Sequence, residues 1–266
     1  MNFAKLLLAG ILASLTLLAP AGAQEPSLTV GTPSSAVMAL VQSLAPEFQK
    51  DTGIAVTASR VKAEGGFSAS GLDSLLLPER IVAGIAALQG SRTEPVFRAD
   101  SVLLGTRGER ARVRGLRDIE KAFRWIAAAR GTFVSSSPSL GLRALEVSLW
   151  DRVGVDVRTR LTWYVEATGD ETDILNRASQ LGAYVLVERA TFAAAHDRRG
   201  LDILVADDPL LQSTYVSLLL DPKNERARAW QEWLKSPAGT AGVARFHING
   251  TEVFRPLEGS TERASG

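Results

Sequence analysis

The chain of 266 residues contains no cysteine, which excludes a disulfide framework and any site built on thiolate ligands. It has only two histidines, His196 and His247, and neither has a second metal-ligating side chain at a spacing that would complete a site. Asp170, Glu171 and Asp173 lack the spacing and the glycine of a calcium loop and instead favour the start of a helix. The sequence therefore predicts no metal site and no cofactor.

Motifs for catalysis are also scarce. There is no G-x-S-x-G elbow and no glycine-rich phosphate loop. Ser59 to Lys62 match the S-x-x-K element of serine acyl-transfer enzymes, but the other two elements of that set are absent. We expect no enzyme activity and no catalytic residue. A serine enzyme that uses Ser59 and Lys62 stays open as the weakest alternative.

Long hydrophobic runs are absent except at the N-terminus, which reads as a secretory signal. Lys5 is its charged region, residues 6–18 are its apolar core, and Ala21-Gly22-Ala23 is an A-x-A cleavage site. We expect residues 1–23 to be removed, so that the mature chain begins at Gln24. Export without a lipid-anchoring cysteine predicts a soluble protein of the periplasm.

Net charge is small once this leader is removed. Without Lys5 the 30 basic residues fall to 29, which equals the number of acidic residues. This balance does not favour nucleic acid or an anionic membrane as a partner.

Patterns typical of helices and of strands alternate along the chain. Apolar residues recur at helical spacing in residues 37–48, and β-type runs follow at 54–58, 184–187, 201–205 and 215–220. Residues 72–89 read as a helix with a break at Pro78. The alternation predicts an α/β fold with mixed, largely parallel sheets.

Two segments share one local pattern, a short strand that leads through a hydroxyl-rich turn into a helix. The first has Thr32, Ser34 and Ser35 in its turn, and the second has Ser135, Ser136 and Ser137. A helix N-terminus carries unpaired N–H groups and a partial positive charge, so that with nearby hydroxyls it can hold an oxyanion or a carboxylate. Such turns are also ordinary N-caps. Two of them about a hundred residues apart favour an anion-binding cleft between two lobes.

An ordered series of short motifs runs through residues 28–58 and 95–257. Its downstream members are Gly169, Asn176 with Ala178-Ser179, Ala183-Tyr184, Arg189 and Thr191, residues 203–209 with Tyr215, Trp233 to Pro237 with Gly239, and Gly250, Phe254 and Pro256. With residues 48–56 and 132–135 upstream, the series resembles the tungstate-binding, periplasmic components of ABC transporters, the TupA type, whose F-x-x-x-T-G-I-x-V and T-F-V-S segments these two upstream stretches match. The resemblance implies a two-lobed type II periplasmic-binding-protein fold, with the ligand in the cleft and lobe closure signalling to a membrane permease.

The same resemblance implies that Thr32, Ser34 and Ser135 contact the oxyanion. This chain departs from the family at the second turn, where Ser136 stands in place of the anion-binding arginine and Leu142 in place of a contacting threonine. Losing that arginine costs about 2–5 kcal/mol unless another cation substitutes. Arg60, at the end of a predicted strand, is our candidate substitute.

We therefore predict a periplasmic solute-binding protein with lobe one in residues 25–99 and 209–260 and lobe two in residues 100–208. The expected ligand-binding residues are Thr32, Ser34, Ser35, Ser135, Ser136, Ser137, Arg60 and Tyr164. The expected partners are a small anion, tungstate first, and an inner-membrane ABC permease, and a monomer is expected. The alternative is a degenerate binding-protein fold that acts as a sensor or interaction protein.

Overall fold

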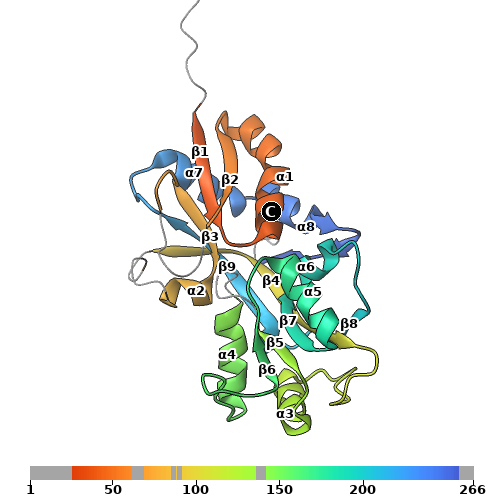
Figure 1. The fold of residues 1–266 in the computed structure, drawn as a ribbon. Helices are drawn as coiled ribbons and strands as arrows, with labels where there is room; N and C mark the ends of the chain where they lie inside the picture. Colours follow the sequence, from red (N-terminus) through yellow and green to blue (C-terminus); the bar gives the residue numbers. More distant parts are fainter. Residues whose placement is uncertain (1–25, 62–68, 85–87, 89–91, 136–141, 258–266) are drawn as a thin grey trace, which may run out of the picture.

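The structure, a computed structural model, describes residues 26–61, 69–84, 88, 92–135 and 142–257 (Figure 1). The predicted leader, and Ser136 and Ser137 of the second turn, lie outside the described residues. Ten strands form one sheet, in the order β2-β1-β3-β9-β4-β7-β5-β6, with β12 and β8 pairing to β4. None of the described helices is long and apolar enough to cross a membrane.

One part of this sheet, which we call the first section, is built from the amino-terminal and carboxyl-terminal parts of the chain. Strand β1 pairs in parallel with β2 and β3, while β9 pairs antiparallel with β3 and with the first half of β4. Its elements are β1 (Ser27–Thr32), α1 (Ser35–Thr52), β2 (Ala55–Arg60), β3 (Ser74–Pro78), α2 (Glu79–Gly84), η3 (Pro209–Leu211), β9 (Gln212–Leu219), α7 (Glu225–Leu234), α8 (Pro237–Arg245) and β12 (Phe254–Pro256). A separate pair, β10 (His247–Ile248) and β11 (Thr251–Glu252), lies beside them.

The second section holds the middle of the chain. Strand β5 pairs in parallel with β6 and β7, and the second half of β4 pairs antiparallel with β7 and β8. Its elements are α3 (Ile119–Ala129), β5 (Phe133–Ser135), α4 (Arg143–Arg152), β6 (Tyr164–Glu166), α5 (Glu171–Leu181), β7 (Tyr184–Glu188), α6 (Arg189–Ala194) and β8 (Leu201–Val205).

Strand β4 (Thr93–Thr106) belongs to both sections. Residues 93–100 pair with β9, and Ser101 begins the pairing with β7. The strand runs through the middle of the molecule, between the red and orange elements and the green and teal ones (Figure 1). The two sections therefore share hydrogen bonds to a single strand.

The predicted α/β class with a mixed sheet is confirmed. Parallel pairing is confined to β1 with its two neighbours and to β5 with its two neighbours. The centre of the sheet is antiparallel because β9, from the carboxyl-terminal part of the chain, lies between β3 and β4 and pairs antiparallel with both. Alternation of helix and strand along the sequence could not predict those neighbours, so the antiparallel share is larger than expected.

The helix expected over residues 72–89 is wrong in its first half. Ser74–Pro78 is strand β3, in which Leu75, Leu76 and Leu77 are fully buried, and the helix α2 begins only after Pro78. A strand that is covered on both faces reads as a continuous apolar run, which periodicity alone cannot distinguish from a buried helix. The proline separates the two elements.

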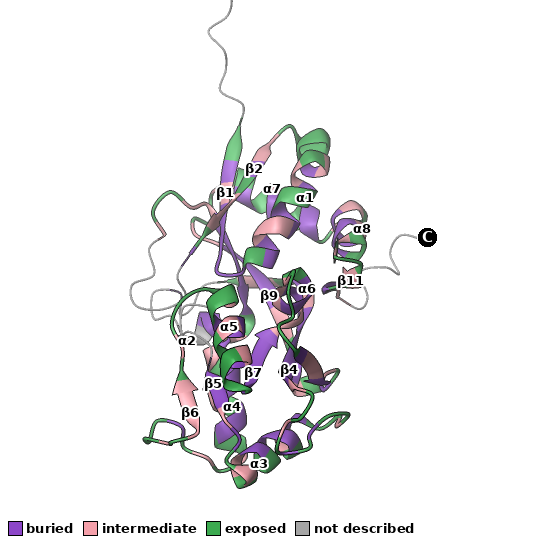
Figure 2. Cartoon of the chain, turned by 45° about the vertical axis from the view of Figure 1, so that its right-hand side comes forward, coloured by how far each residue is buried: buried purple, intermediate pink, exposed green. Residues whose placement is uncertain are grey.

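Each section has its own aromatic core. In the first, Phe48 of α1 packs edge-on against Trp230 and Trp233, with ring centroids 5.0 and 5.5 Å apart. In the second, Phe123 and Trp150 pack with ring centroids 4.3 Å apart. The buried residues run continuously along β4, β7 and β9 in the interior (Figure 2). The two cores hold in place the strands whose ends carry the residues of the candidate site.

Candidate functional site

A small cavity, partly open to solvent, lies where several helices begin. Ser34 is the N-cap of α1, Leu142 the N-cap of α4 and Glu188 the N-cap of the short helix α6, while Glu171 is the first residue of α5. The cavity is lined by Ser34, Leu142, Glu171, Ile174, Leu186, Val187, Glu188 and Thr191. Helix starts from both sections therefore surround one small space.

The electrostatics of these helix starts favour negative charge. Among the described residues no side chain caps α1 or α4, whereas Asp170 and Asp173 form a capping box at α5. Uncapped N–H groups at a helix start are donors that an anion or water can satisfy. The cavity thus combines partial positive charge with a mostly apolar wall.

The hydroxyl of Ser34 points to a carboxylate instead of capping its own helix. Its Oγ donates to Glu188 Oε2 at 2.9 Å, and the hydroxyl of Tyr215 donates to Glu188 Oε1 at 2.6 Å. Thr32, fully buried at the end of β1, accepts the N–H of Ser34 at 3.4 Å. Each oxygen of the Glu188 carboxyl group therefore accepts one hydroxyl hydrogen bond.

Burial raises the pKa of Glu188, because the charged carboxylate loses its hydration. The hydrogen bonds from Tyr215 and Ser34 favour the charged form and oppose this shift, while the nearby carboxylate of Glu171 adds to it. Burial and the adjacent Glu188 also raise the pKa of Tyr215 well above its ordinary range, so it stays a hydroxyl donor. A neutral Glu188 carries no charge that would repel an anion in the cavity.

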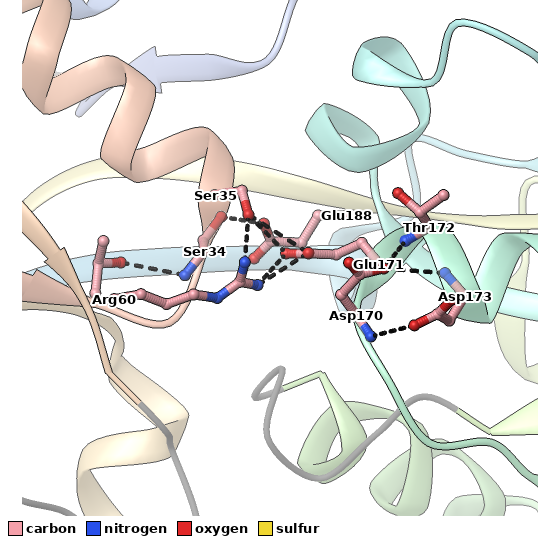
Figure 3. Close-up of polar contacts among 9 residues, drawn as sticks. Ser34, Ser35, Arg60, Asp170, Glu171, Thr172, Asp173 and Glu188 are labelled. Carbon is pink, nitrogen blue, oxygen red and sulfur yellow. Dashed lines mark hydrogen bonds and ion pairs between the residues drawn. The ribbon is translucent and has the colours of Figure 1, made fainter.

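The guanidinium of Arg60 contacts both the first turn and Glu171 of α5, which lines this cavity (Figure 3). Its Nη2 donates to both carboxylate oxygens of Glu171, at 2.9 and 3.0 Å, and its Nη1 donates to Ser35 Oγ at 2.8 Å. Arg60 reaches this place because β1 and β2 are parallel and pair Thr32 with Arg60, so both strands end at the same edge. The contact joins the first section to the second.

The second turn forms a separate polar cluster. Ser135, fully buried at the end of β5, donates to Glu146 Oε2 at 3.1 Å and accepts from Arg143 Nη1 at 2.5 Å. Arg143 also donates to Glu166 at 2.6 Å, and the hydroxyl of Tyr164 donates to Glu146. Burial raises the pKa of Tyr164, as does the adjacent Glu146, so it stays protonated. This cluster therefore holds one cation, Arg143, and two carboxylates, Glu146 and Glu166.

The structure thus brings some of the predicted residues together and separates others. Ser34 lines the cavity with Thr32 directly behind it, and Ser35 and Arg60 both contact Glu171, another of its lining residues. Ser135 and Tyr164 belong to the second cluster, which reaches the cavity only through the neighbouring Leu142. Their roles in ligand binding remain predictions.

Comparison with known proteins gives concordant results. A protein of Haloferax volcanii named as an ABC transporter anion-binding protein is 30% identical over 178 residues, which is 63% of this chain and 52% of that protein. The tungstate-binding protein TupA of Peptoclostridium acidaminophilum is 28% identical over 243 residues, 85% of this chain and 83% of that one. The solved tungstate-binding protein TupA of Desulfovibrio alaskensis G20 is 27% identical, with a TM-score of 0.72 over 87% of this chain and 99% of that one.

The chain is similar over most of its length to TupA-type tungstate-binding proteins. The resemblance seen in the sequence is thereby confirmed, although no family model matches the chain. It spans about half the length of the Haloferax relative. These TupA-type relatives are binding proteins by name, which confirms that the chain is not an enzyme.

Three residues of these clusters were not among our predicted site residues. Glu171 was interpreted only as a helix-start residue, and Glu188 and Arg143 were not candidates. The one signal available was their placement: each acidic residue begins a helix, and Arg143 lies in the first turn of α4. Only the three-dimensional structure shows that Glu171 and Glu188 line one cavity and that Arg143 contacts Ser135.

Proposed function

We propose that the chain is the substrate-binding protein of an ABC transporter and captures a small oxyanion, tungstate first, in the cavity at the helix starts. The observation that carries this proposal is the convergence of the starts of α1, α4 and α5 on one cavity, beside Ser34 and Arg60. Relatives of similar length that bind tungstate by name support the choice of ligand.

Binding proceeds by closure of two lobes in this proposal. Lobe one comprises residues 25–99 and 209–260 and lobe two residues 100–208. The change of partners along β4 between Asp100 and Ser101 supports this division. Ser34 and Arg60 come from one side and Glu171 from the other, so closure assembles the site.

The proposed setting is the periplasm, after removal of residues 1–23, where the closed protein docks as a monomer on an inner-membrane permease. The signal-like N-terminus and the ABC transporter names of the relatives support this setting.

A degenerate binding protein that acts as a sensor or interaction partner is the second candidate. The observation in its favour is that two carboxylates of the protein itself already accept hydrogen bonds from donors near the cavity. Glu188 accepts from Ser34 and Glu171 accepts from Arg60. An anion must enter beside them, without the arginine that Ser136 replaces.

The test is calorimetric titration of the ligand-stripped mature protein with tungstate, with molybdate and sulfate as comparison anions. We expect saturable tungstate binding in the micromolar range or tighter, because helix starts and Arg60 act together. Absence of heat with all three oxyanions would favour the second candidate.

The same titration with Ser34→Ala tests the site itself. Loss of a hydrogen bond to a charged ligand costs about 1.5–3 kcal/mol, which lowers the affinity about tenfold to a hundredfold. Ser43→Ala is the matched control, because the Ser43 hydroxyl bonds the carbonyl of Leu40 and does not line the cavity. Equal affinities of the two variants would place the ligand elsewhere.

A further inference from the structure

The carboxylate of Glu171 is held as a bound oxyanion would be held. Both of its oxygens accept from one nitrogen of Arg60, at 2.9 and 3.0 Å, and both lie 3.4 Å from the hydroxyl of Ser35. Ser35 is the first residue of α1, the helix that begins without a side-chain cap. A guanidinium, a hydroxyl and a helix start therefore surround a carboxylate that belongs to the protein (Figure 3).

The helix that carries Glu171 does not need this side chain for its own start. Asp170 accepts the N–H groups of Thr172 and Asp173 at 2.8 and 3.0 Å, and Asp173 accepts the N–H of Asp170 at 3.1 Å. The capping box is complete without Glu171. The side chain can therefore leave Arg60 without loss of the helix start.

The contact also ties together parts of the chain that pair with different sheet partners. Arg60 ends β2 in the first section, and Glu171 begins α5 in the second. The Arg60 side chain is 42% exposed and that of Glu171 20%, so water and ions reach the pair from the cavity edge. A partly solvated ion pair of this kind is modest in strength and can exchange with an external anion.

We infer that Glu171 occupies the anion subsite formed by Arg60 and Ser35 when no ligand is bound, and that an incoming anion displaces it. The inference rests on the proposed function and deepens it. Glu171 is thus a specificity-determining residue, because an anion binds at Arg60 only if it outcompetes a tethered carboxylate. In the ligand-free protein the same contact holds the two sections together.

The first test compares tungstate affinity in Glu171→Gln, Arg60→Gln and the double variant. We expect Glu171→Gln to raise the affinity about threefold to tenfold, since the competitor is neutralised. The gain should disappear in the Arg60→Gln background, because Glu171 then has no guanidinium to occupy. A gain of equal size in both backgrounds would show simple charge repulsion and overturn the inference.

Glu47→Gln is the matched control for this series. Glu47 forms a similar exposed ion pair with Arg245 at 2.9 Å, but neither residue lines the cavity. We expect its tungstate affinity to equal that of the wild type.

A second test needs no tungstate. The chain has no cysteine, so spin labels at Lys50→Cys in α1 and Gln180→Cys in α5, both exposed positions, report the distance between the sections. Glu171→Ala should give a longer or broader distance distribution than the wild type. Added formate at constant ionic strength should lengthen the wild-type distance, because its carboxylate competes with Glu171 for the subsite, and should leave the distance in Glu171→Ala unchanged.

The two tests separate the failure of the inference from the failure of the proposed function. Tungstate binding by the wild type with no gain in Glu171→Gln overturns the inference and leaves the proposed function standing. If no oxyanion binds to any variant, the proposed function fails. The subsite is then judged by formate alone: an unchanged wild-type distance overturns the inference, and a distance that lengthens in the wild type but not in Glu171→Ala supports it.

Discussion

Glu188 is the residue on which the charge of the cavity depends. Its carboxyl accepts two hydroxyl hydrogen bonds and lines the cavity, and burial raises its pKa. Because the folded protein then holds this proton more tightly than the unfolded chain, the folded state binds more protons above the unfolded pKa. Stability from this group is therefore complete at low pH and is lost as the pH rises towards the folded pKa.

Glu188→Gln should remove this pH dependence. We expect the melting temperature of the variant to rise relative to that of the wild type as the pH increases from about 4 through the folded pKa of Glu188. Differential scanning calorimetry across that range measures the difference, with Glu47→Gln as the surface control. If the melting temperature of the variant instead falls relative to that of the wild type with rising pH, the fold stabilises Glu188 as the carboxylate.

At the scale of elements, the corner between α7 and α8 shows how a short motif sets an angle. Ser236 caps α8 through the N–H of Gly239 at 3.2 Å, and Pro237 occupies the first helical position. A Cβ at Gly239 would lie 2.2 Å from the carbonyl oxygen of Trp233 and 2.8 Å from the Cα of Leu234. The close approach places Trp230 and Trp233 against Phe48 of α1.

Gly239→Ala should therefore destabilise the protein by at least about 2 kcal/mol, since backbone must move to relieve the contact. Urea unfolding measures this free energy. Gly108→Ala is the control, because a Cβ there meets nothing within 4 Å. A Gly239→Ala variant as stable as the control would show that the corner is loosely packed.

At the scale of the whole molecule, β4 makes the two sections depend on each other. Residues 93–100 pair with β9 and β12, and residues 101–106 with β7 and β8. Melting of either section removes the hydrogen-bond partners of half of this strand. The shared strand predicts cooperative unfolding in spite of two aromatic cores.

This cooperativity can be measured with the tryptophans as local probes. Trp230→Phe with Trp233→Phe leaves fluorescence only in the second section, and Trp125→Phe with Trp150→Phe and Trp163→Phe leaves it only in the first. We expect the fluorescence midpoint of each variant in urea to coincide with its own circular dichroism midpoint. Separate midpoints would show that the sections unfold independently.

The sequence was sufficient to predict the elements and much of the fold class. Helix α5 begins where Asp170, Glu171 and Asp173 predicted a helix start, because a capping side chain acts over a few residues. The prediction failed over Ser74–Pro78, where a run of leucines carries no period. The antiparallel centre of the sheet was missed because it joins strands from distant parts of the chain.

For the site, the sequence by itself determined the hydroxyl-rich first turn, the helix that follows it and the position of Arg60 at a strand end. These are local features, and local rules of capping and strand pairing specify them. Only the tertiary structure decided that Ser34 faces Glu188 and that Arg60 meets Glu171 across 111 residues of chain. Contacts between distant segments depend on how whole elements pack, which no local pattern of residues encodes.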